Sequence, residues 1–132
     1  MKSILFIVLI LGSCATKSNK SFCTEMLGSG EGRVIFAVAE KAPHFKGGQE
    51  SLDLYIKQNL DKPNECHEGA VYIHFVVEAQ GSITEARVVK GITEETDTIA
   101  LNLIKNMPNW VPGECQDKPI AHFVVIPVKF SL

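Results

Sequence analysis

Two stretches of the chain carry apolar residues at helical spacing. The first begins near residue 49 and ends before Pro63. Its buried stripe, at i, i+3, i+4 and i+8, consists of Leu52, Tyr55, Ile56 and Leu60. The second follows Thr93, a good N-cap residue with acidic neighbours that favour the start of a helix. Its stripe consists of Ala100, Leu103, Ile104 and Met107.

Four other stretches have the composition or the alternation of strands. Residues 34–39 are continuously apolar, and residues 69–77 alternate between two faces. A loop with Gly81 at a turn position separates this strand from a return strand at 83–90. The last strand, 120–131, has the strongest alternation, with one face formed by Ile120, His122, Val124, Ile126, Val128 and Phe130.

The order of these elements predicts an α+β fold. We expect a small antiparallel or mixed sheet of three to four strands, with two helices packed on one face. The strand at 69–77 lies centrally, with 83–90 on one side and 120–131 on the other. Pro127 cannot donate to a strand ladder, which places the last strand at a sheet edge, at least at this residue. The alternative is that residues 34–39 cover this edge.

The N-terminal residues have the order of a bacterial lipoprotein signal. Lys2 precedes eight apolar residues, too few to span a bilayer, and a Leu-Gly-Ser sequence precedes Cys14. We therefore expect a signal peptide at 1–13 and lipidation of Cys14, which would anchor the chain to a membrane. An ordinary secretory signal is the alternative. Residues 14–32 are polar and rich in Ser and Gly, which predicts a flexible tether before a domain at 33–132.

Composition and motifs exclude several functions. The 13 basic and 15 acidic residues argue against nucleic-acid binding, which needs a concentrated basic face. Phosphate-binding and hydrolase motifs are absent from the sequence, and His74 and His122 lie on predicted strands, so we expect neither an enzyme nor a cofactor. Trp110, between two prolines, is expected in the core; a partner anchor is the alternative.

The cysteines leave a structural role open. The expected topology places Cys66 and Cys115 at opposite ends of the sheet, too far apart for a disulfide. A pair that includes Cys23 is less restricted because the tether can move. A metal site at Cys66, His67 and Cys115 lacks a recognised ligand spacing, so no metal is expected.

Six stretches occur in a fixed order between about residues 39 and 132. They are 42–48 (APHFKGG), 69–83 (GAVYIHFVVEAQGSI), 89–92 (VKGI), 107–113 (MPNWVPG), 118–120 (KPI) and 127–130 (PVKF). Together they resemble the C-terminal domain of TonB-type energy transducers in its Bacteroidetes-like form. This chain differs from that family in three ways. The predicted lipidation signal at residues 11–14 (a lipobox) stands in place of the inner-membrane helix and Pro-rich spacer of the family. The segment between Pro63 and Gly69 is shorter, and Lys62 stands where an aromatic residue is common.

The resemblance implies a periplasm-facing module that binds outer-membrane TonB-dependent transporters. An extended transporter segment would add to the sheet beside the last strand, so the alternating residues from Ile120 to Phe130 are the predicted partner-binding set. Together with the lipobox, the resemblance implies a lipid-anchored module. We expect the anchor on the outer membrane, because Ala15, the residue after the lipidated cysteine, is not the acidic residue of a retention signal. The alternatives are a genuine TonB-type energy transducer and a structural envelope lipoprotein stabilised by a disulfide or a metal.

Overall fold

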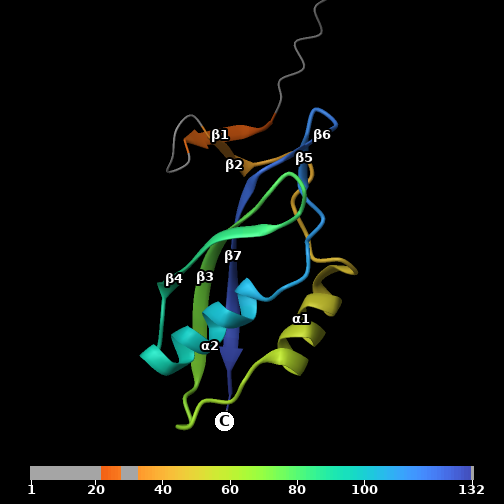
Figure 1. Cartoon of the computed structure of the whole chain (residues 1–132). Helices are drawn as coiled ribbons and strands as arrows, with labels where there is room; N and C mark the ends of the chain where they lie inside the picture. The colour runs from red at the N-terminus through yellow and green to blue at the C-terminus, as the bar shows by residue number, and fades with distance from the viewer. Residues whose placement is uncertain (1–21, 28–32, 132) are drawn as a thin grey trace, which may run out of the picture.

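The computed structural model describes residues 22–27 and 33–131 (Figure 1). The predicted signal peptide and Cys14 lie outside this part. The elements are β1 (Thr24–Leu27), β2 (Val34–Val38), α1 (Gly48–Asn59), β3 (Gly69–Val77), β4 (Ile83–Lys90), α2 (Glu94–Lys105), β5 (Gly113–Cys115), β6 (Lys118–Ile120) and β7 (His122–Phe130). They form a five-stranded sheet in the order β1-β2-β7-β3-β4 and a two-stranded sheet of β5 and β6. No helix in the described residues is long and apolar enough to cross a membrane.

Strand β3 lies between β4 and β7, as the sequence predicted. It pairs antiparallel with both, and its register with β7 is unbroken from Gly69 opposite Phe130 to Val77 opposite His122. Strands β4 and β7 are therefore parallel to each other, and α2 forms the predicted crossover between them. Every second side chain of β3 is fully buried, because alternate residues of a strand face the same side. These side chains are Val71, Ile73, Phe75 and Val77.

Both helices pack against the face of the sheet that carries these side chains (Figure 1). Helix α1 contributes Leu52 to the core, and α2 contributes Ala100, Leu103 and Ile104. Burial of one such large apolar side chain stabilises the fold by about 1.5–3 kcal/mol. The predicted α+β class with two helices on one face is confirmed. The main sheet has one strand more than the largest number expected.

Local sequence determines how α2 and the β3–β4 loop are held. The Oγ1 of Thr93 accepts the N–H of Thr96 (3.2 Å), and the Oγ1 of Thr96 accepts the N–H of Thr93 (3.0 Å). This reciprocal pair is a capping box, which satisfies two helix N-terminal donors. Gly81 has a φ of 91°, and its carbonyl accepts the N–H of Trp110 (2.8 Å). Trp110 is 4% exposed and its ring meets Phe75 edge-on, so the prediction of a core tryptophan is confirmed.

Strand β1 lies inside the segment predicted as a flexible tether, residues 14–32, and corrects that prediction at residues 24–27. Residues Thr24–Leu27 form a strand that pairs antiparallel with β2. Strand β2 is the strand predicted at residues 34–39. Its Ile35 is fully buried but lies outside the main core cluster, as does the fully buried Val76 on the helix-free face of the sheet.

The predicted last strand is divided in two by Ala121. Ile120 ends β6, which forms a hairpin with β5, and the long strand β7 begins at His122. The turn between β5 and β6 has Gln116 and Asp117 at φ of 52° and 59°. Two consecutive positive φ values are typical of a type I′ turn. Alternation of side chains could not predict this hairpin, because it continues through the residues where the chain bends.

Candidate functional site

Strand β7 has one side fully paired and the other mostly open. On one side it pairs with β3 over nine residues. On the other side β2 runs parallel to it and pairs only at Phe36 opposite His122, where the Phe36 N–H donates to the Ala121 carbonyl (2.8 Å). Beyond this point no strand of the described residues pairs with β7 on that side. The rest of this side offers unpaired backbone groups.

The position of Pro127 shows which backbone groups face the open side. Pro127 lies opposite Tyr72 on β3. Because proline has no N–H, the two cannot exchange a pair of hydrogen bonds, and the Pro127 carbonyl points away from β3. Residues two positions away have the same orientation, so the N–H and C=O groups of Val125 and Lys129 also face outward. We call this row, Val125, Pro127 and Lys129, the open edge.

A groove of about 720 Å³ runs along the open edge, between β7 and α1. Its apolar lining comes from both elements and from the segment after α1: Leu52, Ile56, Leu60, Pro63, Val125, Ile126, Pro127 and Phe130. Its polar lining is Gln49, Asp53, Lys57, Asp61, Lys62, Lys129 and Ser131. Residues from both faces of β7 contribute, so the groove follows the edge of this strand. We call it the α1–β7 groove.

Helix α1 is fixed at a distance from β7 by contacts that involve Phe45, just before the helix, and Tyr55 within it. At its start, Gly47 has a φ of 91°, and Phe45 packs against both Tyr55 (5.5 Å between ring centroids) and Trp110 (5.9 Å). The Tyr55 hydroxyl also donates to the carbonyl of Asn106, the residue that caps α2 (3.2 Å). These contacts tie α1 to the core through α2 and Trp110. They leave the side of β7 next to α1 uncovered.

The predicted partner-binding residues lie near this site, but their side chains do not form the edge. Ile126, Val128 and Phe130 are buried in the core, and Val124 is packed against it. Ile120 belongs to β6 rather than to β7, and His122 lies at the position that β2 covers. The open edge is formed instead by the alternate residues, which sequence analysis did not select. The signal was present in Pro127, whose missing N–H is tolerated only where no partner strand needs it.

The last strand has an open edge at Pro127, where the sequence predicted one, but its beginning is covered. In the sheet order, β7 is the middle strand, between β2 and β3. The alternative, cover by residues 34–39, applies at Phe36 alone. Chain direction explains this partial cover: after Val38 the backbone leaves the sheet, and Lys41 forms a bridge with Glu114 of β5. Most of the length of β7 therefore remains accessible.

A family model described as Gram-negative bacterial TonB protein C-terminal matches residues 65–132, more than half of the chain. The chain belongs to this family. Proteins of the TonB family act in the cell envelope or periplasm, and their C-terminal domains interact with outer-membrane TonB-dependent transporters. Neither a curated protein nor a solved structure matches the chain.

The outer edge of this TonB C-terminal domain at β4 is less suited to accept a strand. Pairing of β4 with β3 shifts register twice, and Glu85 has a φ of 53° in the irregular part. Bulges and exposed charges, here Arg87 and Lys90, are common protections of edge strands against added partners. The open edge of β7 has regular pairing behind it and an apolar groove beside it. It is the better candidate for strand addition.

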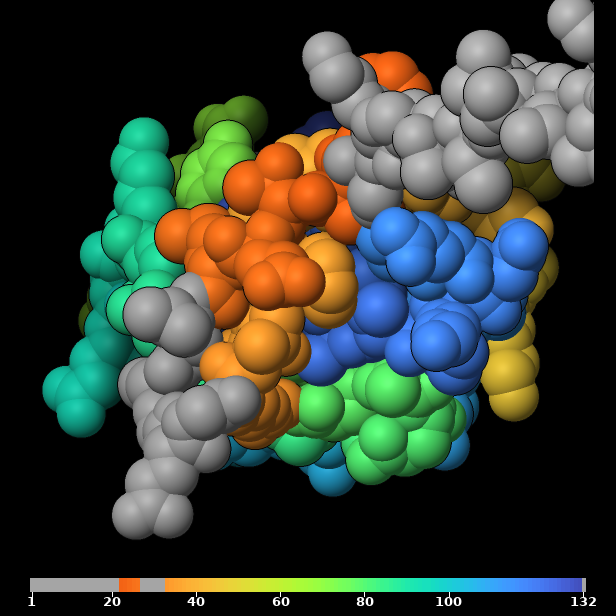
Figure 2. Space-filling model, turned by 90° about the horizontal axis from the view of Figure 1, so that it is seen from above, coloured from red at the N-terminus to blue at the C-terminus, as the bar shows by residue number. Residues whose placement is uncertain are grey.

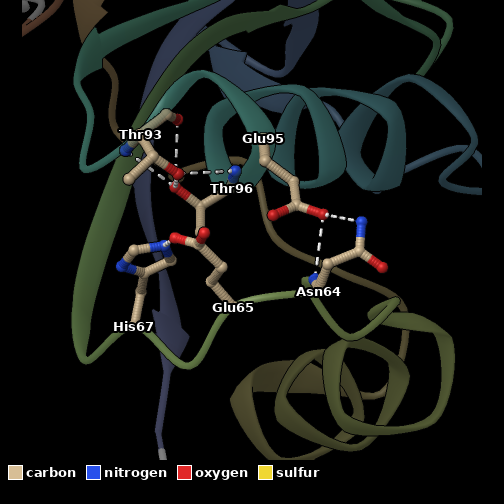
Figure 3. Close-up of polar contacts among 6 residues, drawn as sticks. All are labelled: Asn64, Glu65, His67, Thr93, Glu95 and Thr96. Carbon is tan, nitrogen blue, oxygen red and sulfur yellow. Dashed lines mark hydrogen bonds and ion pairs between the residues drawn. The ribbon is translucent and has the colours of Figure 1, made fainter.

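The segment that joins α1 to β3 is held against the start of α2 by polar contacts (Figure 3). Asn64 donates to the Glu95 carboxylate through its backbone N–H (2.9 Å) and its side-chain amide (2.7 Å). His67 lies 3.6 Å from the Glu65 carboxylate. Thr93 and Thr96 are engaged in the capping box. These contacts position the end of the groove-lining segment, and the hydroxyl groups beside them are used as helix caps.

The cysteines of the described residues form one disulfide, between Cys23 and Cys115, with Cα atoms 6.3 Å apart. Cys66 is free and exposed. The sequence left a Cys23 pair open, and its argument against a bond between Cys66 and Cys115 agrees with this pairing. The sulfurs of the disulfide and a Glu40 carboxylate oxygen lie within 4.8 Å of one another. Bonded sulfurs are not thiolates, so this group offers no thiolate ligands while the disulfide is intact.

Proposed function

We propose that this protein is a lipid-anchored, periplasm-facing binding module that docks TonB-dependent outer-membrane transporters. An extended segment of the transporter adds as a strand to the open edge of β7. The observation that carries the proposal is this open edge with an apolar groove beside it. The role is one of binding and not of catalysis. Energy transduction of the ordinary TonB type is the first alternative.

Main-chain pairing supplies affinity in this mode, and the groove supplies selectivity. An incoming strand can exchange two hydrogen bonds each with Val125 and Lys129 and can donate one to the Pro127 carbonyl. Each of these bonds contributes about 0.5–1.5 kcal/mol net. Alternate side chains of the added strand enter the α1–β7 groove, where Leu52 and Ile56 favour apolar residues. We therefore expect a short segment that alternates between apolar and polar residues.

A variant that removes one donor from the open edge tests the docking mode. Lys129→Pro deletes an N–H that faces away from β3, as Pro127 already does, so the nine-residue ladder is kept. The matched control, Lys129→Ala, keeps the backbone donor. Each full-length protein is immobilised and mixed with detergent-solubilised outer membranes, and captured proteins are identified by mass spectrometry. Circular dichroism melting confirms that both variants are folded.

We expect a TonB-dependent transporter on the wild type and on Lys129→Ala, and a loss of about two- to tenfold on Lys129→Pro, because one hydrogen bond of about 0.5–1.5 kcal/mol is removed. A photo-crosslinking residue at position 129 should attach to a transporter segment outside the barrel. If folded Lys129→Pro captures as much transporter as the control, strand addition at this edge is wrong. If the wild type captures none, the docking function itself is wrong.

Lipid anchoring is tested separately. Cys14 should incorporate an alkyne fatty acid in cells, and the protein should fractionate with the outer membrane. Cys14→Ser should abolish both results. Labelling of Cys14→Ser at the wild-type level would exclude this site. A second candidate, a structural envelope lipoprotein, is favoured by the Cys23–Cys115 disulfide, and it predicts that no transporter is captured.

A further inference from the structure

The Cys23–Cys115 disulfide joins two residues that the backbone connects only by a path through β1 to β5, which includes both helices. Its cysteines are 92 residues apart in sequence. The closed loop between them contains both helices, β3 and β4, whereas β6 and β7 follow it. Seen from above, the N-terminal strands lie beside the β5–β6 hairpin (Figure 2). Cys23 stands one residue before β1, and Cys115 ends β5.

Without this bond, the N-terminal strands would be weakly attached to the domain. Strand β1 pairs with β2 through four residue pairs with one irregularity, and β2 pairs with β7 through a single pair. A pull on Phe22 would reach the first residue of β1 directly. The hydrogen bonds of a short hairpin that is pulled from its end break one after another. Tension from the N-terminal side would therefore remove β1 and β2 before it reached β7.

With the bond present, tension follows a shorter covalent route. It leaves the backbone at Cys23, enters at Cys115, and passes through the β5–β6 turn into β7. On this route the three residue pairs of the β5–β6 hairpin are loaded first, and tension then runs along β7, which is already extended. Helix α1 and β3 lie within the closed loop, off the direct route, so the α1–β7 groove keeps its shape.

We propose that the Cys23–Cys115 disulfide carries mechanical load from the N-terminal segment to β7. It leads tension through the short β5–β6 hairpin into the strand that accepts a partner, and it spares β1 and β2. The proposal extends the proposed docking function, because tension arises when a bound partner moves against the anchored end. The test of this proposal uses the protein without a partner, so a failure of the proposal can be distinguished from a failure of docking.

Single-molecule force spectroscopy on the full chain tests this route. The handles are attached through p-azidophenylalanine at positions 22 and 129, two exposed positions outside the disulfide. In the oxidised protein only the β5–β6 turn lies between the disulfide and β7, so the early extension should not exceed the roughly 20 Å that residues 116–121 span when extended. The double variant Cys23→Ser/Cys115→Ser should show an additional and longer step, because β1 and β2 then lie on the route. Residues 24–40, which precede the bridge between Lys41 and Glu114, reach about 55–60 Å when extended. Since their ends begin close together, the step should be about 50 Å.

The control is Cys66→Ser, which removes the free thiol and should behave as the oxidised protein. If the double variant does not fold, the folded wild type is held in the trap and treated with a phosphine reductant, and the same longer step should then appear. A step of about 50 Å in the oxidised protein would overturn the proposal. The proposal would also be overturned if the step were absent after reduction. It would be overturned too if the intact mass of the wild type showed that the disulfide had not formed, because its formation removes two hydrogens.

Discussion

Gly81→Ala provides a quantitative test of how the β3–β4 loop is held against the core. Gly81 has a φ of 91°, and a Cβ at this position would lie 2.2 Å from the Trp110 carbonyl oxygen. That oxygen belongs to the backbone and cannot rotate away. Gly48 is the matched control, because it has a φ of 82° but no heavy atom within 4 Å of the added Cβ. Comparison of the two variants separates the free-energy cost of the left-handed backbone conformation from the cost of the steric clash.

The magnitudes differ because only one site has a clash. A left-handed conformation costs a residue with a side chain about 1–2 kcal/mol. Reduced freedom of the unfolded chain offsets about 0.4–1 kcal/mol of this cost. Gly48→Ala should therefore lower the free energy of unfolding by about 1 kcal/mol. Gly81→Ala must also move the loop away from Trp110, which breaks a backbone hydrogen bond worth about 0.5–1.5 kcal/mol and loosens the tryptophan. We expect a total loss of about 3 kcal/mol.

Urea denaturation followed by tryptophan fluorescence and by far-ultraviolet circular dichroism measures both variants. Trp110 is the single tryptophan of the chain, so the fluorescence reports on the contact itself. One kcal/mol corresponds to a shift of about 4–8 °C in the melting temperature of a domain of this size, and thermal melts give an independent check. Equal losses for the two variants, within about 0.5 kcal/mol, would refute the clash and with it the close contact between Gly81 and Trp110.

Burial and the nearby Arg87 lower the pKa of His74 in the folded protein. Below about pH 6.5 the unfolded chain therefore binds more protons than the folded one, and the free energy of unfolding should fall as the pH decreases. His74→Gln should show a smaller fall between pH 7 and 5 in urea titrations. Thr93→Ala should lower the free energy of unfolding by about 1 kcal/mol through loss of the helix cap, whereas Thr98→Ala, on the same helix, should change it by less than half as much in the same assay. Asp117→Gly should raise the melting temperature, because the φ of 59° at this position suits glycine; an unchanged or lower value would show that the aspartate makes a compensating contact.

Much of the secondary structure could be predicted because its signals are local. Alternation identified β3 and most of β7, and helical spacing identified both helices within a few residues of their ends. The Thr93 cap and the Gly81 turn were also predicted, since a cap and a tight turn depend on a few adjacent residues. Strand β1 was missed because four residues in a polar, Ser- and Gly-rich segment show no alternation. The strand forms because β2 provides a partner.

The site was predicted only in part, because side-chain alternation and backbone direction are separate properties of a strand. The sequence identified the apolar face of β7 and assigned it to the partner. In the structure this face belongs to the core, and the open backbone groups belong to the alternate residues, Val125 and Lys129. Which residues face outward depends on which side of β7 is taken by β3. That choice is made by pairing between distant segments.

The sequence by itself determined the helices, the main strands, the α+β class and the family, because these depend on spacing, caps, turns and ordered motifs. Only the tertiary structure decided that β2 covers one position of β7, that Cys23 bonds to Cys115, and that α1 leaves a groove beside the open edge. Each of these contacts joins segments far apart in the chain. Its free energy depends on the packing of the whole fold against the entropy of closing long loops, and no local pattern encodes that balance.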